Sequence, residues 1–409
     1  MRFVFRPSAA GAVELLGLPW SEPLEEWRDD ALMTVPQRGI SRHVVRFIAS
    51  EGAVYALKEL DERLARREYQ LLGDFAEEGL PAVEALGICV ERPDDLPAIL
   101  VTRFLEYSMS YRYVFSRPGA EAPGRLIDTM AELLVRLHLA GIFWGDCSLS
   151  NTLFLPDAGT MSAYLVDAET VERHPSLSDG QRGYDLDLAT ERVAAELMDL
   201  AAGGLLPDDV DPIELAAALR DTYETLWAEV TCEEHLPAEQ SGDRVVERVR
   251  RLGDLGFDAG EVELTTSPQG ARLKVQTSVG EPGRHRHELF RLTGLEVQEH
   301  QARRLLDDLA GYRAWLEQRD GVALSDIVAG HRWVAEIYSP VVDAIPSHLA
   351  GRLAPPEVFH EILEHRWFLS EAAGGDVGTA EAAASYFADV LPLTPKEFTT
   401  PSVMAAELL

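Results

Sequence analysis

The amino-acid sequence predicts a mixed α+β domain in the first half of the chain and a mainly α-helical domain in the second half. Short segments of alternating apolar and polar residues flank a helix-like segment early in the chain. A strongly amphipathic segment follows at residues 125–140, with apolar residues three and four positions apart. From residue 295 onward, helical spacing dominates.

A chain of 409 residues is too long for one typical domain. We expect an N-terminal extension with a short helix at residues 1–35, an α+β domain at residues 36–232 and a mainly helical domain at residues 240–409. The sequence contains no Walker A motif and no Gly-x-Gly-x-x-Gly motif. This weighs against a P-loop domain and against a Rossmann domain.

The first domain reads as strands, helix, strands, helix, short strands and then helices. Residues 42–60 predict two strands around the turn at Glu51-Gly52. Residues 61–79 have helical spacing and end at Gly79-Leu80-Pro81. The further expected elements are strands at 88–90 and 98–104, a helix at 125–140, strands at 153–155 and 164–166, and helices within 184–230. This order is typical of an α+β fold and not of a βαβ repeat.

The second half predicts a strand pair followed by helices. The strands are expected at residues 262–265 and 272–279, and the helices at 295–318, 322–339, 355–371 and 378–389. His285 and His287 would share one face of a strand, as two ligands of a metal site do. No cysteine or further acidic ligand completes such a site, so a role at a hairpin tip or an interface is the alternative.

The charge of the chain restricts its partners. Acidic residues number 69 and basic residues 37, which gives a net charge of −32 and opposes binding to bare nucleic acid or to an anionic membrane surface. No apolar run approaches the length of a membrane span, and the N-terminus lacks a signal-peptide pattern. We therefore expect a cytoplasmic protein. The three cysteines have no metal-site or redox spacing, which suits a reducing compartment: Cys89, Cys147 and Cys232.

Basic charge is almost entirely arginine. The only lysines are Lys58, Lys274 and Lys396, and the only asparagine is Asn151. This usage is typical of a GC-rich bacterial genome. Where arginine and aspartate are the easy choices, a remaining lysine or asparagine indicates a position whose chemistry rejects them.

Polar residues suited to phosphate chemistry follow one another along the first domain. Lys58 ends a predicted strand, and Glu68 lies on the next helix. Asp146 and Asn151 follow the helix at 125–140, and Asp167 ends a short strand. An ammonium group can neutralise phosphate oxygens, a carboxylate can fix that ammonium, and carboxylate and amide oxygens suit Mg²⁺.

These segments resemble the protein-kinase-like superfamily. The Asp-x-x-x-x-Asn spacing from Asp146 to Asn151 resembles the kinase catalytic loop, and residues 54–58 resemble the strand that carries the phosphate-binding lysine. Asp167 corresponds to the first residue of the Asp-Phe-Gly motif. The resemblance implies a bilobal protein-kinase-like fold that uses ATP and Mg²⁺.

The motifs are nearest to those of small-molecule kinases. Gly145-Asp146 resembles the His-Gly-Asp form of small-molecule and bacterial lipopolysaccharide kinases, and Asp167-x-Glu169 resembles the Asp-x-Asp/Glu of aminoglycoside and choline kinases. The resemblance implies one role for each residue. Lys58 would bind phosphates, Glu68 would pair with Lys58, Asp146 would be the catalytic base, Asn151, Asp167 and Glu169 would bind metal, and Asp187 would brace the catalytic loop.

The chain departs from the kinase pattern in several places. Residues 37–43 replace the Gly-rich loop, and Ser41 and Arg42 in this segment are candidates for phosphate contacts. Ser148 replaces the lysine that follows the catalytic aspartate by two residues. Another cation would then have to neutralise the transition state, and the candidates are Arg38, Arg42 and Arg182. No Ala-Pro-Glu segment for docking a peptide is present, which favours a small-molecule kinase over a protein kinase.

We therefore expect an ATP-dependent phosphotransferase that acts on a hydroxyl group of a small molecule, sugar or glycolipid. The alternatives are a nucleotide-binding pseudokinase-type regulator with little turnover and a pseudokinase that transfers an adenylyl group. The C-terminal half resembles a domain of unknown function that is fused to lipopolysaccharide-kinase-like domains in actinobacteria. We expect it to shape the acceptor pocket or to form a homodimer.

Overall fold

The computed structural model describes residues 1–6, 15–27, 32–33, 43–50, 53–115, 123–231, 234–236, 247, 259–267, 270–277, 283–321 and 323–394. These residues fall into two compact units. The first unit runs to residue 154 and continues from residue 163 to residue 277. The second unit comprises residues 155–162 and 283–394, so it includes a short piece of the first half of the sequence.

A six-stranded sheet forms the first lobe of the first unit, in the order β1-β5-β6-β4-β3-β2. Each neighbouring pair is antiparallel, which confirms the predicted α+β class. The strands are β1 (Arg2–Phe5), β2 (Leu32–Met33), β3 (Val44–Ser50), β4 (Ala53–Leu60), β5 (Ala85–Val90) and β6 (Ala98–Arg103).

The N-terminal residues are part of this lobe. β1 pairs with β5 along its whole length. Residues 15–27 contain one short 3₁₀ helix, η1 (Leu24–Glu26), and bury Trp20 and Trp27 against the sheet together with Tyr55 and Leu57 of β4. The prediction of a helical extension missed the strand, because the first residues contribute to a sheet whose other strands lie far along the chain.

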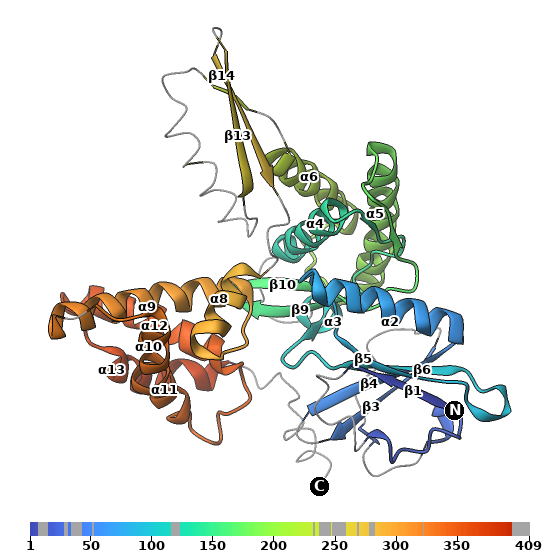
Figure 1. The fold of residues 1–409 in the computed structure, drawn as a ribbon, viewed down its shortest axis with the longest axis horizontal. Helices are drawn as coiled ribbons and strands as arrows, with labels where there is room; N and C mark the ends of the chain where they lie inside the picture. The colour runs from blue at the N-terminus through green and yellow to red at the C-terminus, as the bar shows by residue number, and fades with distance from the viewer. Residues whose placement is uncertain are drawn as a thin grey trace. The chain divides into compact units, whose positions relative to one another are not determined.

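The opposite face of the sheet is covered by helix α2 (Glu62–Glu77), which Figure 1 shows lying across β5 and β6. Asp61 caps this helix and accepts a hydrogen bond from the Arg63 backbone N–H at 2.9 Å. Successive residues of a strand point to opposite faces, so Leu57 enters the core beneath Trp20 while Lys58 points the other way. Lys58 therefore faces α2.

The second lobe of the first unit is mainly helical. Helix α4 packs against α6, and α6 packs against α5 (Figure 1). A three-stranded sheet in the order β10-β9-β7 and a strand pair, β11-β8, also occur in this part of the chain. The tip of β9 and β10, residues 155–162, belongs to the second unit. The elements are β7 (Met109–Ser110), α3 (Tyr111–Phe115), α4 (Pro123–Leu139), β8 (Ile142–Phe143), β9 (Thr152–Asp157), β10 (Thr160–Leu165), β11 (Glu172–Arg173), α5 (Asp179–Ala202) and α6 (Pro212–Thr231). The short helix η2 (Pro93–Asp95) lies in the first lobe, between β5 and β6.

A three-stranded sheet follows, in the order β12-β14-β13. Its strands are β12 (Glu234–Leu236), β13 (Ala259–Ser267) and β14 (Gly270–Thr277). The strand pair predicted at 262–265 and 272–279 is confirmed; the first strand is longer than predicted, the second begins two residues earlier, and residues 278–279 lie outside the described residues.

The second unit is helical from residue 284 onward, which confirms the predicted class. Trp333 and Phe359 are fully buried in its core and pack edge to face with ring centroids 5.6 Å apart. Its elements are α8 (Arg284–Thr293), α9 (Glu299–Asp320), α10 (Asp326–Trp333), η4 (Val334–Tyr338), α11 (Ser339–Asp343), α12 (Pro355–Ala373), α13 (Thr379–Ser385), η5 (Tyr386–Val390) and η6 (Leu391–Leu393).

The arrangement of His285 and His287 as two metal ligands would need a strand, but both residues lie on helix α8. Residues two apart on a helix point in different directions, so the two rings do not share a face. His285 instead bonds through Nδ1 to Glu299 at 2.6 Å. In the described ranges, no group of three or more His, Cys, Asp and Glu side chains is arranged to hold a metal ion. Among the helices of these ranges, none is long and apolar enough to cross a membrane.

Arg92 ties the N-terminal segment to the sheet. Its side chain is fully buried and donates to the Trp20 carbonyl at 2.8 Å, to Glu59 of β4 at 2.6 Å and to the Glu22 carbonyl. A buried charge is tolerated only when its hydrogen-bonding groups are satisfied, so these contacts fix the path of residues 20–22.

Replacing Arg92 with leucine should leave the Glu59 carboxylate without its buried partner. We expect Arg92→Leu to lower the free energy of unfolding by about 3–5 kcal/mol. Urea denaturation followed by tryptophan fluorescence measures the loss. Arg2→Leu is the control, because Arg2 pairs with Glu91 at the surface, where both side chains are 54% exposed. The control should lose less than about 1 kcal/mol; equal losses in the two variants would contradict the structural role of Arg92.

Candidate functional site

Lys58 lies between two carboxylates. Its Nζ is 3.1 Å from Glu68 Oε2 on α2 and 3.0 Å from Asp167 Oδ2, which follows strand β10. Glu68 belongs to the buried stripe of α2 with Ala65, Leu72 and Phe75, so the helix aims its carboxylate at the sheet. The structure thus brings together three residues that the sequence motifs singled out.

The electrostatics of this cluster keep Lys58 charged. Burial lowers the pKa of Lys58, but Glu68 and Asp167 outweigh this effect, and the pKa lies above its ordinary value. Burial raises the pKa of Glu68 to about 7, against the lowering effect of Lys58. The result is a fixed ammonium group with a side chain that is only 14% exposed.

Glu169 lies at the edge of the same cluster. Its Oε2 is 4.0 Å from Lys58 Nζ and 2.8 Å from His43 Nε2. The backbone N–H of Glu169 donates to Asp167 Oδ1 at 2.9 Å, and that of Ala168 donates to Glu68 Oε1 at 3.3 Å. These backbone contacts orient both Asp167 and Glu68. No sequence pattern indicated that His43 would reach this cluster.

Asn151 and Asp146 lie on a loop, residues 144–151, that runs between β8 and β9. Asn151 Nδ2 donates to the Asp146 carbonyl at 3.0 Å, and the Val166 backbone N–H donates to the Asn151 carbonyl at 3.0 Å. Asn151 therefore lies beside the end of β10, next to the residue that precedes Asp167. The Asp146 carboxylate pairs with Arg192 of helix α5.

Asp185 of α5 fixes the start of this loop. Its fully buried carboxylate accepts hydrogen bonds from the backbone N–H groups of Trp144 at 2.7 Å and Gly145 at 2.8 Å, and it lies 3.0 Å from His138 Nε2. Asp187 was predicted to brace the loop, and that prediction is wrong. Asp187 is exposed and pairs with Arg220, because a residue two positions further along a helix points away from the loop.

Glu196 fixes the other end of the loop. Its carboxylate accepts from the backbone N–H of Leu149 at 2.6 Å and of Ser150 at 3.2 Å. Burial raises its pKa, although these hydrogen bonds act in the opposite direction. Asp185, Arg192 and Glu196 follow one another at intervals of seven and four residues, so one stripe of α5 contacts the whole loop.

A pattern in the sequence would have found Asp185. The buried residues of α5 recur at helical spacing: Asp185, Leu186, Ala189, Val193, Leu197 and Leu200. Asp185 lies four residues before Ala189 and so continues the apolar stripe, whereas Asp187 falls outside it. An acidic residue on an apolar stripe indicates a buried carboxylate with a specific partner.

Of the three cations proposed to replace the missing lysine, the structure describes one, Arg182. Arg182 lies 4.0 Å over the Trp227 ring and pairs with Asp179, so it is directed away from the loop. Arg192, which the sequence analysis did not propose, contacts Asp146 instead. Arg38, Ser41 and Arg42 lie outside the described residues.

The residues suit Mg²⁺ as a bound ion. Asp167 and Glu169 would supply carboxylate oxygens and Asn151 its amide oxygen, while the Asn151 amide nitrogen donates to the Asp146 carbonyl. Mg²⁺ prefers oxygen ligands and keeps several positions for water and substrate phosphates. An oxygen-only set with few protein ligands fits that preference.

We expect Asp185→Ala to destabilise the protein strongly, because the Trp144 and Gly145 backbone N–H groups and the buried His138 ring would all lose their partner. Unsatisfied buried groups cost about 1–3 kcal/mol each, so the free energy of unfolding should fall by about 3 kcal/mol or more. Asp187→Ala on the same helix turn is the matched control and should lose less than about 1 kcal/mol. Urea denaturation of both variants gives the comparison; a larger loss for Asp187→Ala would contradict the assignment of the brace.

Solved structures and family models match parts of this chain. The chain is similar to "WaaP in complex with acyl carrier protein", at 18% identity and a TM-score of 0.37 over 62% of this chain and 99% of that chain. It is also similar to "aminoglycoside-3'-phosphotransferase of type VIII", at 17% identity and a TM-score of 0.35 over 49% of this chain and 88% of that chain. No curated protein matches the chain. Residues 51–191 match the Lipopolysaccharide kinase (Kdo/WaaP) family, and residues 225–391 match the Domain of unknown function (DUF4032), so the chain carries a lipopolysaccharide-kinase-family domain followed by this second domain.

Proposed function

We propose that the protein is an ATP- and Mg²⁺-dependent phosphotransferase that acts on a hydroxyl group of a small molecule, sugar or glycolipid. The observation that carries the proposal is the Lys58 ammonium, placed 3.1 Å from Glu68 and 3.0 Å from Asp167. Phosphoryl transfer needs little covalent chemistry from the protein and depends on positioned charge. The family match of residues 51–191 supports the same reaction class.

Each residue of the cluster has a task in this proposal. Lys58 neutralises nucleotide phosphates, and Glu68 keeps its ammonium in place. Asn151, Asp167 and Glu169 would bind Mg²⁺, which supplies positive charge to the phosphoryl oxygens. Ser41 and Arg42 remain candidates for further phosphate contacts.

Asp146 is the proposed catalytic base. Its carboxylate would orient the acceptor hydroxyl and take up its proton. Asp185 and Glu196 fix both ends of its loop, so the carboxylate is positioned before substrate arrives. Arg192 provides a cation beside Asp146 where Ser148 offers none.

The ion pair between Arg192 and Asp146 also favours a second candidate function. A carboxylate that is paired with a guanidinium group must give up this partner before it can contact an acceptor hydroxyl. A nucleotide-binding regulator with little turnover would retain Lys58 and Asp167 for binding. The two functions therefore share the nucleotide site and differ in product release.

Nucleotide binding should raise the melting temperature of the wild-type protein. A ligand at 100 times its dissociation constant adds about 2.7 kcal/mol of stability to the folded state. We expect Lys58→Met and Asp167→Ala to lose the shift that Mg-ATP produces, because each removes a charge from the phosphate or metal position. Asp187→Ala should keep the full shift. Thermal unfolding with Mg-ATP tests this, and a wild-type protein that shows no shift at millimolar Mg-ATP would refute the nucleotide site.

We expect Asp146→Asn to bind Mg-ATP like the wild type but to lose turnover by about 10²–10⁴-fold. The assay follows release of ADP and pyrophosphate with a panel of sugars and glycolipids as acceptors, with Asp187→Asn as the control. Unchanged ADP release in Asp146→Asn would sink the assignment of the base. Pyrophosphate release would identify adenylyl transfer instead, and binding without either product would identify the regulator.

A further inference from the structure

The hairpin formed by β9 and β10 connects two of the proposed metal-binding residues. β9 begins at Thr152, directly after Asn151, and β10 ends at Leu165, two residues before Asp167. The hydrogen bond from the Val166 N–H to the Asn151 carbonyl closes the base of the hairpin. A displacement of the hairpin would therefore also displace Asn151 and Asp167.

The turn of this hairpin has a conformation that needs external support. Ala158 has φ 53° and Gly159 has φ 75°, so both central residues are in the left-handed region. Glycine adopts this conformation readily, whereas alanine is strained there. A strained residue persists where its surroundings determine it, and residues 155–162 belong to the second unit of the structure.

Glu357 of α12 satisfies the backbone of the turn. Its carboxylate, 3% exposed, accepts from the N–H groups of Ala158 at 2.9 Å and Gly159 at 3.2 Å. Gln301 Nε2 donates to the same carboxylate at 2.6 Å and to the Pro156 carbonyl at 3.2 Å. One carboxylate therefore holds both central residues of the turn through their backbone N–H groups.

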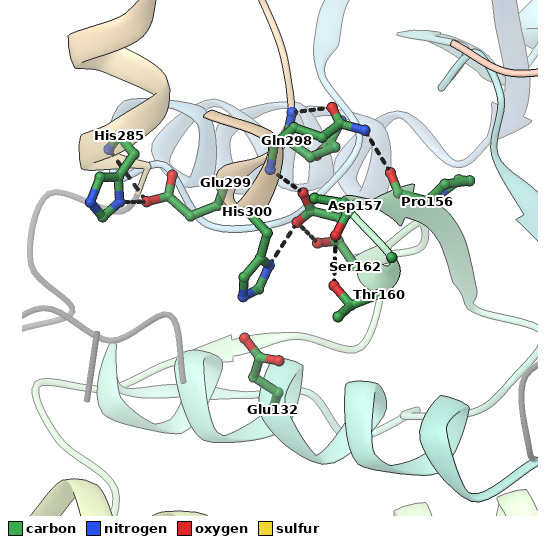
Figure 2. A network of polar contacts seen from close by, with 12 residues as sticks. Glu132, Pro156, Asp157, Thr160, Ser162, His285, Gln298, Glu299 and His300 are labelled. Carbon is green, nitrogen blue, oxygen red and sulfur yellow. Dashed lines mark hydrogen bonds and ion pairs between the residues drawn. The ribbon is translucent and has the colours of Figure 1, made fainter. Parts of the chain in front are cut away.

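Asp157 attaches the same turn to the start of α9. Its fully buried carboxylate accepts from the Gln301 backbone N–H at 2.8 Å and from Ser162 Oγ at 2.7 Å, and it lies 3.0 Å from His300 Nδ1 (Figure 2). A carboxylate is favoured at a helix N-terminus, where backbone N–H groups lack partners. Burial raises the pKa of Asp157, but His300 and the other donors outweigh it and hold the pKa below its ordinary value.

We propose that the second unit positions the magnesium-binding residues of the phosphotransferase through this turn, with Asp157 and Glu357 as positioning residues. Both buried carboxylates accept hydrogen bonds from donors of the turn and from Gln301 of α9. Asp157 accepts from the Gln301 backbone N–H, and Glu357 accepts from the Gln301 side chain. The turn therefore cannot shift without leaving a buried charge unsatisfied. β9 and β10 carry that constraint to Asn151 and Asp167. The inference rests on the proposed function, and it assigns a role in catalysis to the domain of unknown function.

The test separates metal-dependent from metal-independent nucleotide binding. We expect Glu357→Gln to weaken binding of Mg-ATP by about tenfold, the lower end of what is lost when groups that orient metal ligands are changed, because Glu357 acts on Asn151 and Asp167 only through the hairpin. Binding of ATP in EDTA should fall less, because it depends on Lys58, which Glu68 still holds when Asp167 moves. Isothermal titration of the full chain with Mg-ATP and with ATP plus EDTA measures both, and Glu371→Gln on the exposed end of α12 is the matched control. Ser162→Ala removes one hydrogen bond to Asp157 and should act in the same direction more weakly if Glu357→Gln does not fold.

The outcomes distinguish the two proposals. Mg-ATP binding that is equal in wild type, Glu357→Gln and Ser162→Ala, with Lys58→Met inactive in binding, would overturn the positioning role and leave the nucleotide site intact. Equal loss of both forms of binding in Glu357→Gln would also overturn it, because a merely structural defect does not select for the metal. A wild-type protein that binds no ATP in either condition would overturn both proposals.

Discussion

Buried or half-buried carboxylates that accept hydrogen bonds from backbone N–H groups determine where two loops of this protein lie. Asp185 and Glu196 do this for residues 144–151, and Asp157 and Glu357 do it for the turn of the β9–β10 hairpin. An isolated carboxylate in a protein interior is very unfavourable, so it stays ionised only when several donors converge on it. Each loop is thereby held in place, because its carboxylate partners would lose their hydrogen bonds if the loop moved.

The same principle explains the position of Lys58. The strand pattern of β4 sends Leu57 into the core beneath Trp20 and Lys58 to the side of α2. The N-terminal segment and α2 thus cover opposite faces of one sheet, and the ammonium group lies on the face that offers carboxylates. Because both faces of the sheet are covered, the position of the Lys58–Glu68–Asp167 cluster depends on the packing of the whole lobe and not on one loop.

Much of the fold and of the candidate site could be predicted from the sequence, because the signals are local. Lys58, Glu68, Asp146, Asn151 and Asp167 lie at short, recognisable spacings on elements with clear periodicity, and the structure places Lys58, Glu68 and Asp167 together. Asp185 was within reach of the same reasoning, since the apolar stripe of α5 passes through it and not through Asp187.

Other features could not be predicted, because their partners are distant in sequence. Asp157-Ala158-Gly159 reads as an ordinary exposed turn, and its donors and acceptors lie 144 and 199 residues away. β1 likewise pairs with a strand more than eighty residues further along the chain. Periodicity describes which face of an element is buried, but it does not identify the segment that covers that face.

The pairing of β1 with β5 has a consequence for how the sheet is protected from other molecules. β5 has apolar, fully buried residues along its length, and β1 occupies its outer edge. The fit depends on Gly87, where a side-chain carbon would meet the Val4 carbonyl oxygen at 2.8 Å and collide with the Phe5 ring. A larger residue at this position would displace β1 and leave β5 as an open, apolar edge, which is the kind of surface that recruits strands from other chains and leads to aggregation. The four residues of β1 therefore cover the edge of β5 and so protect the protein from self-association.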